Sequence, residues 1–194
     1  MAGGSSAARR QALIVAGSVL IAWSWYEARR RPLPPNEERI FRAINGASDR
    51  FKVPIRAVMQ AGTFATVPVA AGVALLAGRR KLAGRLLIGG TAAWLGAKAI
   101  KPLGGRERPA GVIEDVHIRE GIEGDLGWVS GHAAVATTLA LIAANELPAW
   151  TKPLLAGVVA TTAFGRIYVG AHLPHDVVGG TGLGMVISGL VDVL

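Results

Sequence analysis

Uncharged runs separated by short clusters of charge are the dominant pattern along this chain. The charge-free stretches are residues 11–26, 57–78, 86–97, 131–145, 153–165 and 177–191. A helix that spans a bilayer needs about 20 mostly apolar residues, and only 57–78 reaches that length without flanking residues. Six such runs leave too little polar surface for a soluble protein of this length. The pattern therefore predicts an all-α fold, a six-helix transmembrane bundle in which flanking residues lengthen the shorter helices.

The first run follows Arg9 and Arg10 and so resembles the start of a secretory signal. It ends in Trp23-Ser24-Trp25-Tyr26 with no small-residue cleavage site. Aromatic residues of this kind gather where a membrane helix meets water. We therefore expect a retained first helix, preceded by a cytoplasmic N-terminal tail over 1–10. The remainder, 11–194, is expected to form one membrane-embedded domain.

Residues 27–56 form a long connection between the first and second charge-free runs. Three prolines, Pro32, Pro34 and Pro35, break any helix at its start. From Asn36 onward, apolar residues alternate with charged ones in a pattern that suits an amphipathic helix lying on the membrane surface. A solvated connector is the alternative interpretation of the same residues.

The composition agrees with a membrane protein and argues against a soluble domain, a disordered chain and any site that needs cysteine. Hydrophobic residues make up 51% of the chain, charged residues 18%, and the mean hydropathy is +0.40. A soluble domain carries about 25% charged residues, and a disordered chain is poor in hydrophobic ones. The chain has no cysteine, which excludes disulfides, thiolate metal sites and cysteine nucleophiles.

Charge distribution predicts the orientation. Residues 79–85 hold three arginines and a lysine in one short loop, a strong signal for the cytoplasmic side. This puts 101–130 on the external face, and that loop has six acidic and four basic residues. The 27–56 connection would lie on the same face and opposes the assignment, because it has eight basic and four acidic residues.

Three separated stretches carry polar residues at the edges of the predicted helices, where ionisable groups are costly and usually functional. Because successive helices alternate in direction, all three stretches are expected at one membrane face, with 101–130 as the active-site loop. The stretches contribute Lys101 and Arg108; Ser130, Gly131 and His132; and Arg166, His172 and Asp176.

The cations of this set suit a phosphate ligand. Lys101, Arg108 and Arg166 have no matching set of anions in these stretches, and arginine presents a planar fork that fits phosphate oxygens. Ser130 is a good N-cap, and the free backbone N–H groups around Gly131 then make an anion site at a helix N-terminus.

Two histidines and an aspartate supply the remaining chemistry. His172 and Asp176 are four positions apart, so on a helical turn the carboxylate orients the imidazole. His132, from another helix, is placed to protonate a leaving oxygen. These residues need no metal or cofactor, although spacing alone leaves open which histidine attacks. A zinc site of His132, His172 and His175 is the disfavoured alternative, because cations crowd it and carboxylate ligands are few.

At these residues the chain resembles the type 2 phosphatidic acid phosphatase family, which shares its site with vanadium haloperoxidases. The family pattern is K-x6-RP, PSGH and SR-x5-H-x3-D, and the chain matches nine fixed positions over about 101–176. Val129 replaces the family's proline and Gly165 its serine, which puts one hydroxyl contact to phosphate in doubt. The matching residues are Lys101, Arg108, Pro109, Ser130, Gly131, His132, Arg166, His172 and Asp176.

The resemblance implies a role for each matching residue. Lys101, Arg108, Ser130, Gly131 and Arg166 would hold the phosphate. His172 would attack phosphorus and form a phosphohistidine, Asp176 would orient it, and His132 would protonate the leaving group and then activate water.

The implied function is an integral membrane phosphatase that hydrolyses a lipid phosphate or polyprenyl (di)phosphate without a metal. A phosphate or head-group transferase between lipids, and a non-catalytic protein that binds anionic lipids, are the alternatives. The expected partners are the lipid substrate and membrane lipids, with no nucleic acid. The expected location is the cell membrane. Gly180-x-x-x-Gly184 is a small-residue packing motif, for which contact within the chain is favoured over a homodimer.

Overall fold

Every regular element of the chain is helical across residues 2–121 and 124–192, which the computed structural model describes. In that range the only β-type pairing is an isolated bridge between Glu107 and Leu126. The all-α prediction is therefore confirmed. The α-helices are α1 (Ala2–Ala28), α2 (Pro35–Asn45), α3 (Lys52–Met59), α4 (Thr66–Leu76), α5 (Arg80–Gly104), α6 (Gly131–Glu146), α7 (Lys152–Tyr168) and α8 (Pro174–Val191).

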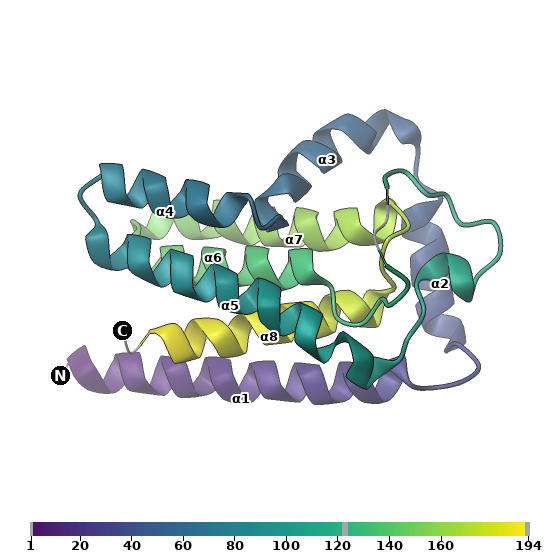
Figure 1. The fold of residues 1–194 in the computed structure, drawn as a ribbon, viewed down its shortest axis with the longest axis horizontal. Coiled ribbons are helices and arrows are strands. Elements are labelled where there is room, and N and C mark those ends of the chain that lie inside the picture. Colours follow the sequence, from purple (N-terminus) through teal and green to yellow (C-terminus); the bar gives the residue numbers. More distant parts are fainter. Residues whose placement is uncertain (1, 122–123, 193–194) are drawn as a thin grey trace.

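The long helices form a bundle with α6 at its centre. Helices α1, α4, α5, α6, α7 and α8 lie side by side along the long axis of the molecule (Figure 1). Helix α6 packs on α5, α7 and α8, while α1 packs on α8 and α4 on α5. The run Ala133–Ala140 of α6 is buried at every position. Small side chains such as its alanines permit this close approach of neighbouring helices.

Glycines on α8 set its distance from two neighbours. A Cβ atom added at Gly180 would collide with the Ser130 carbonyl oxygen, and one at Gly184 would lie 2.6 Å from the Ala134 carbonyl oxygen, both on the α6 side. On the opposite side, a Cβ at Gly182 would lie 2.7 Å from the Gly17 carbonyl oxygen of α1. The small-residue motif is thus used within the chain, as expected.

The prediction that residues 57–78 form one spanning helix is wrong. Helix α3, a short 3-10 turn at Gln60–Gly62 and α4 divide it, and the two parts are bent by 70°. The side chains of Thr63 and Thr66 both donate to the Gln60 carbonyl oxygen, at 2.8 and 2.7 Å, and so satisfy the end of the first part. Pro68 lacks an N–H and fits only the first turn of the helix that follows.

The predicted count of six helices is not confirmed, because the described chain has eight α-helices. Within that part, no single helix is both long and apolar enough to pass as a membrane crossing. The bent pair Asp49–Gly62 and Thr66–Leu76 passes when its two parts are taken together.

The connection 27–56 folds into α2 and α3. Helix α2 covers one end of the bundle and contacts α7 and α8. Its Phe41 is buried, whereas Ile40 is half exposed. The segment is therefore not a free connector, since its amphipathic helix is docked on the bundle. The N-terminal tail expected over residues 1–10 is mostly helical, because α1 begins at Ala2. Met1 lies outside the described residues.

The two ends of the bundle differ in content (Figure 1). The start of α1, the end of α8 and the turn between α4 and α5 lie at one end, where Arg79 donates to the Glu146 carbonyl oxygen at 2.8 Å and Arg9 lies 3.6 Å from Asp192. Helix α2, the segments 105–121 and 124–130 and the turn between α7 and α8 lie at the other end. The three polar stretches therefore meet there. Glu123, which lies in the loop between the first two stretches, falls outside the described residues.

Candidate active site

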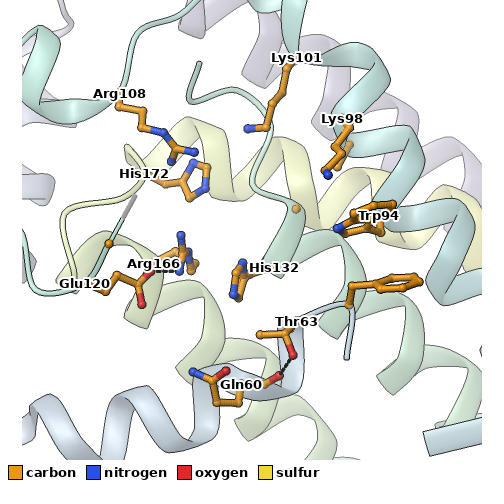
Figure 2. Close-up of a pocket in the computed structure, with 15 residues that line it drawn as sticks. Gln60, Thr63, Trp94, Lys98, Lys101, Arg108, Glu120, His132, Arg166 and His172 are labelled. Carbon is orange, nitrogen blue, oxygen red and sulfur yellow. Dashed lines mark hydrogen bonds and ion pairs between the residues drawn. The ribbon is translucent and has the colours of Figure 1, made fainter. Parts of the chain in front are cut away.

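A cavity of about 400 Å³ opens at the α2 end of the bundle, between α5, α6, α7 and the break before α4. Its size lies within the range of about 300–1,000 Å³ of small-molecule sites. Ser130 and Asp176, which the sequence also singles out, do not line it. Among its lining residues are the predicted Lys101, Arg108, Gly131, His132, Arg166 and His172 (Figure 2). Sequence reasoning did not select Gln60, Gly62, Thr63, Phe64, Trp94, Ala97, Lys98, Glu120 and Gly121.

His172 and Asp176 form the buried pair expected from their spacing. Nδ1 of His172 lies 3.5 Å from Oδ2 of Asp176, and both side chains are almost completely buried. His172 itself precedes the helix, because Leu173 is the N-cap of α8 and Pro174 its first residue. The Leu173 N–H donates to the same Asp176 oxygen at 2.9 Å and fixes the carboxylate behind the imidazole ring.

The surroundings of His172 favour a neutral imidazole. Burial lowers the pKa of His172 well below its ordinary value of 6.5, and the positive charges of Arg166, Lys101 and Arg108 lower it further. His172 lies in the turn between α7 and α8, with its ring facing the cavity (Figure 2). A neutral imidazole keeps a lone pair on one ring nitrogen, which a nucleophile requires.

A buried arginine that the sequence did not single out holds Asp176 from behind. Nη1 of Arg106 donates to Oδ1 of Asp176 at 3.3 Å. The same guanidinium donates to both carboxylate oxygens of Glu37 in α2, at 2.9 and 2.5 Å. The K-x6-RP pattern singles out Arg108 in this charged loop, and no sequence feature marks Arg106. The pairing appears only when α2 folds over that loop.

Lys101 lies in the cavity wall, and its ammonium N–H groups already donate to backbone carbonyl oxygens. Its Nζ donates to the carbonyl oxygens of Leu126, Gly127 and Val129 at 3.1, 3.1 and 3.0 Å. A lysine ammonium has three N–H groups, so these contacts occupy all of them. Lys101 therefore ties the segment before α6 to α5 and contributes positive charge to the cavity.

The two arginines of the cavity are both held in place. Arg108 donates to the carbonyl oxygens of Gly124 and Ala171, at 2.7 and 2.8 Å. Arg166 forms a short ion pair with Glu120, which also lines the cavity. The expectation that the three polar stretches hold no matching set of anions does not extend to the loop between them, which supplies Glu120 as the partner of Arg166. Glu120 was overlooked because it lies in the loop, away from the three polar stretches.

The N-terminus of α6 points toward the cavity. The hydroxyl of Ser130 accepts a hydrogen bond from the Ala133 N–H at 3.4 Å, as a helix N-cap does. Ser130 is buried behind the wall, and its own N–H donates to the Asp176 carbonyl oxygen at 2.8 Å. Gly131 and His132 follow and line the cavity, so the first turn of α6 presents backbone amides and an imidazole to it.

The zinc alternative requires His175 in this group, and the structure keeps it elsewhere. The His175 ring makes an edge contact with Trp23 at 5.0 Å, and its Nδ1 lies 3.0 Å from Glu37. It does not line the cavity. Across the described ranges, no three His, Asp or Glu side chains come together in a way that could hold a metal ion.

The two departures from the family pattern are both accommodated by packing. Val129 is completely buried in the main apolar core. A Cβ atom at Gly165 would lie 3.0 Å from Ile55 and 3.2 Å from Met59, so this position of α7 faces α3. Gly165 does not line the cavity.

Comparison with known proteins gives a consistent result. An undecaprenyl-diphosphatase from Sulfolobus acidocaldarius is 29% identical over 122 residues, which are 63% of this chain and 59% of that protein. The matched part thus spans less than two thirds of the relative's length.

Two solved structures share the fold. The LpxE structure from Aquifex aeolicus has a TM-score of 0.71 and 23% identity, covering 80% of this chain and 94% of that one. The PAP2-type phosphatidylglycerolphosphate phosphatase from Bacillus subtilis has a TM-score of 0.73 and 19% identity, covering 95% of this chain and 94% of that one.

The family model of the PAP2 superfamily matches residues 82–192. This is more than half of the chain, and it includes the three polar stretches that meet at the cavity. The resemblance found in the motifs is therefore confirmed, and the chain belongs to the PAP2 superfamily.

Proposed function

We propose that this protein is an integral membrane phosphatase that hydrolyses a lipid phosphate or polyprenyl (di)phosphate through a phosphohistidine. One observation carries the proposal. The buried imidazole of His172 faces a cavity whose wall includes Arg108, Arg166 and the N-terminus of α6, with Asp176 directly behind it. This arrangement combines a nucleophile, an orienting carboxylate and donors for phosphate oxygens in one place.

The reaction proceeds in two balanced steps. The free ring nitrogen of His172 attacks phosphorus, a P–N bond forms, and the bond from phosphorus to the leaving oxygen breaks. His132 donates a proton to that oxygen. Water then attacks the phosphohistidine, His132 accepts a proton from it, and the P–N bond breaks to release phosphate. Arg108, Arg166 and the α6 amides bind the equatorial oxygens. Protein groups alone carry these steps.

A membrane location is part of the proposal. Large apolar side chains stand exposed on the flanks of the bundle, including Val69, Val73 and Leu76 of α4, of which Leu76 is 91% exposed. Contiguous apolar surface of this kind favours contact with lipid. The basic turn at Arg79 and Arg80 lies at the end opposite the cavity, which supports an active site on the external face.

Phosphate release from a panel of lipid phosphates by the purified protein tests the proposal. We expect His172→Ala to abolish release and His117→Ala to retain it, because His117 is exposed and does not line the cavity. His132→Ala should retain a labelled phosphoenzyme for longer, since its hydrolysis is slowed. Undiminished phosphate release by His172→Ala would overturn the mechanism, and release from no lipid phosphate by the wild type would overturn the function.

A further inference from the structure

Lys98 and Lys101 lie one turn apart on α5 and both line the cavity (Figure 2). Their polar contacts differ. The ammonium of Lys101 is fully used by three carbonyl oxygens. Among the residues that the structure describes, no carboxylate or carbonyl oxygen pairs with the Lys98 ammonium, which lies 3.8 Å from the centre of the Trp94 ring. Lys98 thus brings a cation with unused donors to the cavity.

Aromatic side chains hold Lys98 at one rim. Trp94 lies one turn before Lys98 on α5, and the face of an aromatic ring attracts an ammonium group. Phe64, from the break before α4, packs on Trp94 with the ring centres 4.6 Å apart. Both rings line the cavity, and Phe64 is 40% exposed. Together, Phe64 and Trp94 form an aromatic shelf beside the ammonium.

The shelf lies across the cavity from the attacking group. Figure 2 shows His172, Arg108 and Arg166 on one side, Trp94 and Lys98 on the other, and His132 between them. Because in-line attack places the leaving group opposite the attacking nitrogen, the leaving group of a phosphoryl group bound at His172 is directed to the side of the cavity that carries His132 and Lys98.

We propose that Lys98 binds the second phosphate of a lipid diphosphate and makes the diphosphate the preferred substrate. This inference rests on the function proposed above and specifies its substrate class. The terminal phosphoryl group occupies the site at His172, the inner phosphate meets Lys98, and the apolar chain leaves over the aromatic shelf.

The charge balance of the reaction explains the preference. When His172 attacks the terminal phosphorus of a diphosphate, the bond to the bridging oxygen breaks and that oxygen stays on the inner phosphate. The products of hydrolysis are inorganic phosphate and a lipid monophosphate. Negative charge develops on the inner phosphate during bond cleavage, where Lys98 stabilises it. A monophosphate substrate instead releases an alcohol oxygen, which His132 protonates, and offers Lys98 no second phosphate.

The experiment compares a short-chain polyprenyl diphosphate with the matching monophosphate, using the full-length protein in detergent. Lys98→Met removes the charge and keeps the length of the stem. Lys81→Met is the matched control, because Lys81 is exposed at the opposite end of α5 and does not line the cavity. We expect Lys98→Met to lower the ratio of kcat/KM for the diphosphate to that for the monophosphate by at least about tenfold, as for a lost charged hydrogen bond. Lys98→Arg should recover most of the ratio.

Inhibition gives a second measurement that needs no lipid. Pyrophosphate should inhibit the wild type more strongly than phosphate, and Lys98→Met should reduce that difference while Lys81→Met retains it. An unchanged ratio in Lys98→Met, or a wild type that prefers the monophosphate, would overturn the role of Lys98 while leaving the phosphatase function intact. A wild type that hydrolyses neither substrate nor other lipid phosphates would overturn the function itself.

Discussion

Glu37 and Arg106 are 69 positions apart in the chain and form a buried, bidentate ion pair. The same guanidinium reaches Asp176, so one arginine pairs with two carboxylates. Through this contact, α2 is tied to the residue that stands behind His172. The helix that covers the end of the bundle is therefore part of the support of the candidate site.

Removal of the Glu37 charge should destabilise the protein strongly. Glu37→Gln removes one of the two carboxylates that pair with the buried Arg106, and a lost hydrogen bond to a charged group costs about 1.5–3 kcal/mol of unfolding free energy. Glu38→Gln is the matched control, because Glu38 follows Glu37 in the chain and makes a surface ion pair with Arg42 at 2.7 Å. Such surface pairs contribute about 0–1 kcal/mol. Denaturant unfolding in detergent measures both, and equal losses would contradict the role assigned to the buried pair.

The same carboxylate predicts a pH dependence of stability. Burial alone raises the pKa of Glu37, but hydrogen bonds from His175 and Arg106 and the Arg106 charge outweigh it and bring the pKa to about 2, from 4.5. Because the folded-state pKa is the lower one, the stabilisation is complete above the unfolded value of 4.5 and is lost as the pH falls toward about 2. The difference in Tm between wild type and Glu37→Gln should shrink over this interval. A difference that stays constant with pH would contradict the assignment.

Glu120 should compete with phosphate for Arg166. The short ion pair between them lies in the cavity wall, so an incoming phosphate has to replace the carboxylate. Glu120→Gln is expected to lower the inhibition constants of phosphate and vanadate several-fold, and to lower stability without ligand because Arg166 is buried. Added phosphate should restore that stability, since a ligand stabilises the state that binds it.

The control for this comparison is Glu114→Gln. Glu114 is an exposed acidic residue in the same segment and does not line the cavity. Weaker inhibition by phosphate in Glu120→Gln than in Glu114→Gln would show that Glu120 supports anion binding, contrary to this prediction.

The features that could be predicted from the sequence follow from the spacing of nearby residues and from the direction of the helices. The spacing of His172 and Asp176 brings their side chains together in the structure, although His172 precedes the helix. The alternating direction of the long helices brings Arg166 and His132 to one cavity. Gly180 was assigned to packing within the chain because a residue without a Cβ permits close backbone contact, and it contacts α6.

The features that could not be predicted depend on contacts between distant segments. Glu37 lies in an amphipathic pattern that normally directs carboxylates to water, and only the docking of α2 on Arg106 makes its burial favourable. The run 57–78 has the composition of a single helix, yet hydrogen bonds from Thr63 and Thr66 end the first part at Gln60. Pattern alone does not report such tertiary contacts.

Gly165 provides a test of why this chain departs from its family pattern. The sequence suggests that a serine here would add a hydroxyl contact to phosphate, whereas in the structure a Cβ at this position would press on Ile55 and Met59 of α3. Met59 in turn contacts Arg166, with Sδ 3.7 Å from Nη1. Added atoms in a packed interface cost about 1–3 kcal/mol.

Gly165→Ser should therefore lower the free energy of unfolding by about that amount, without strengthening inhibition by phosphate. Gly157→Ser on the same helix is the matched control, because a Cβ there meets no atom within 4 Å. In a Met59→Ala background, Gly165→Ser should cost less than it does in the wild type but should not become neutral, since Ile55 still restricts the site. Stronger phosphate inhibition in Gly165→Ser, with stability equal to that of Gly157→Ser, would show that position 165 serves the cavity and that its contact with α3 does not limit it.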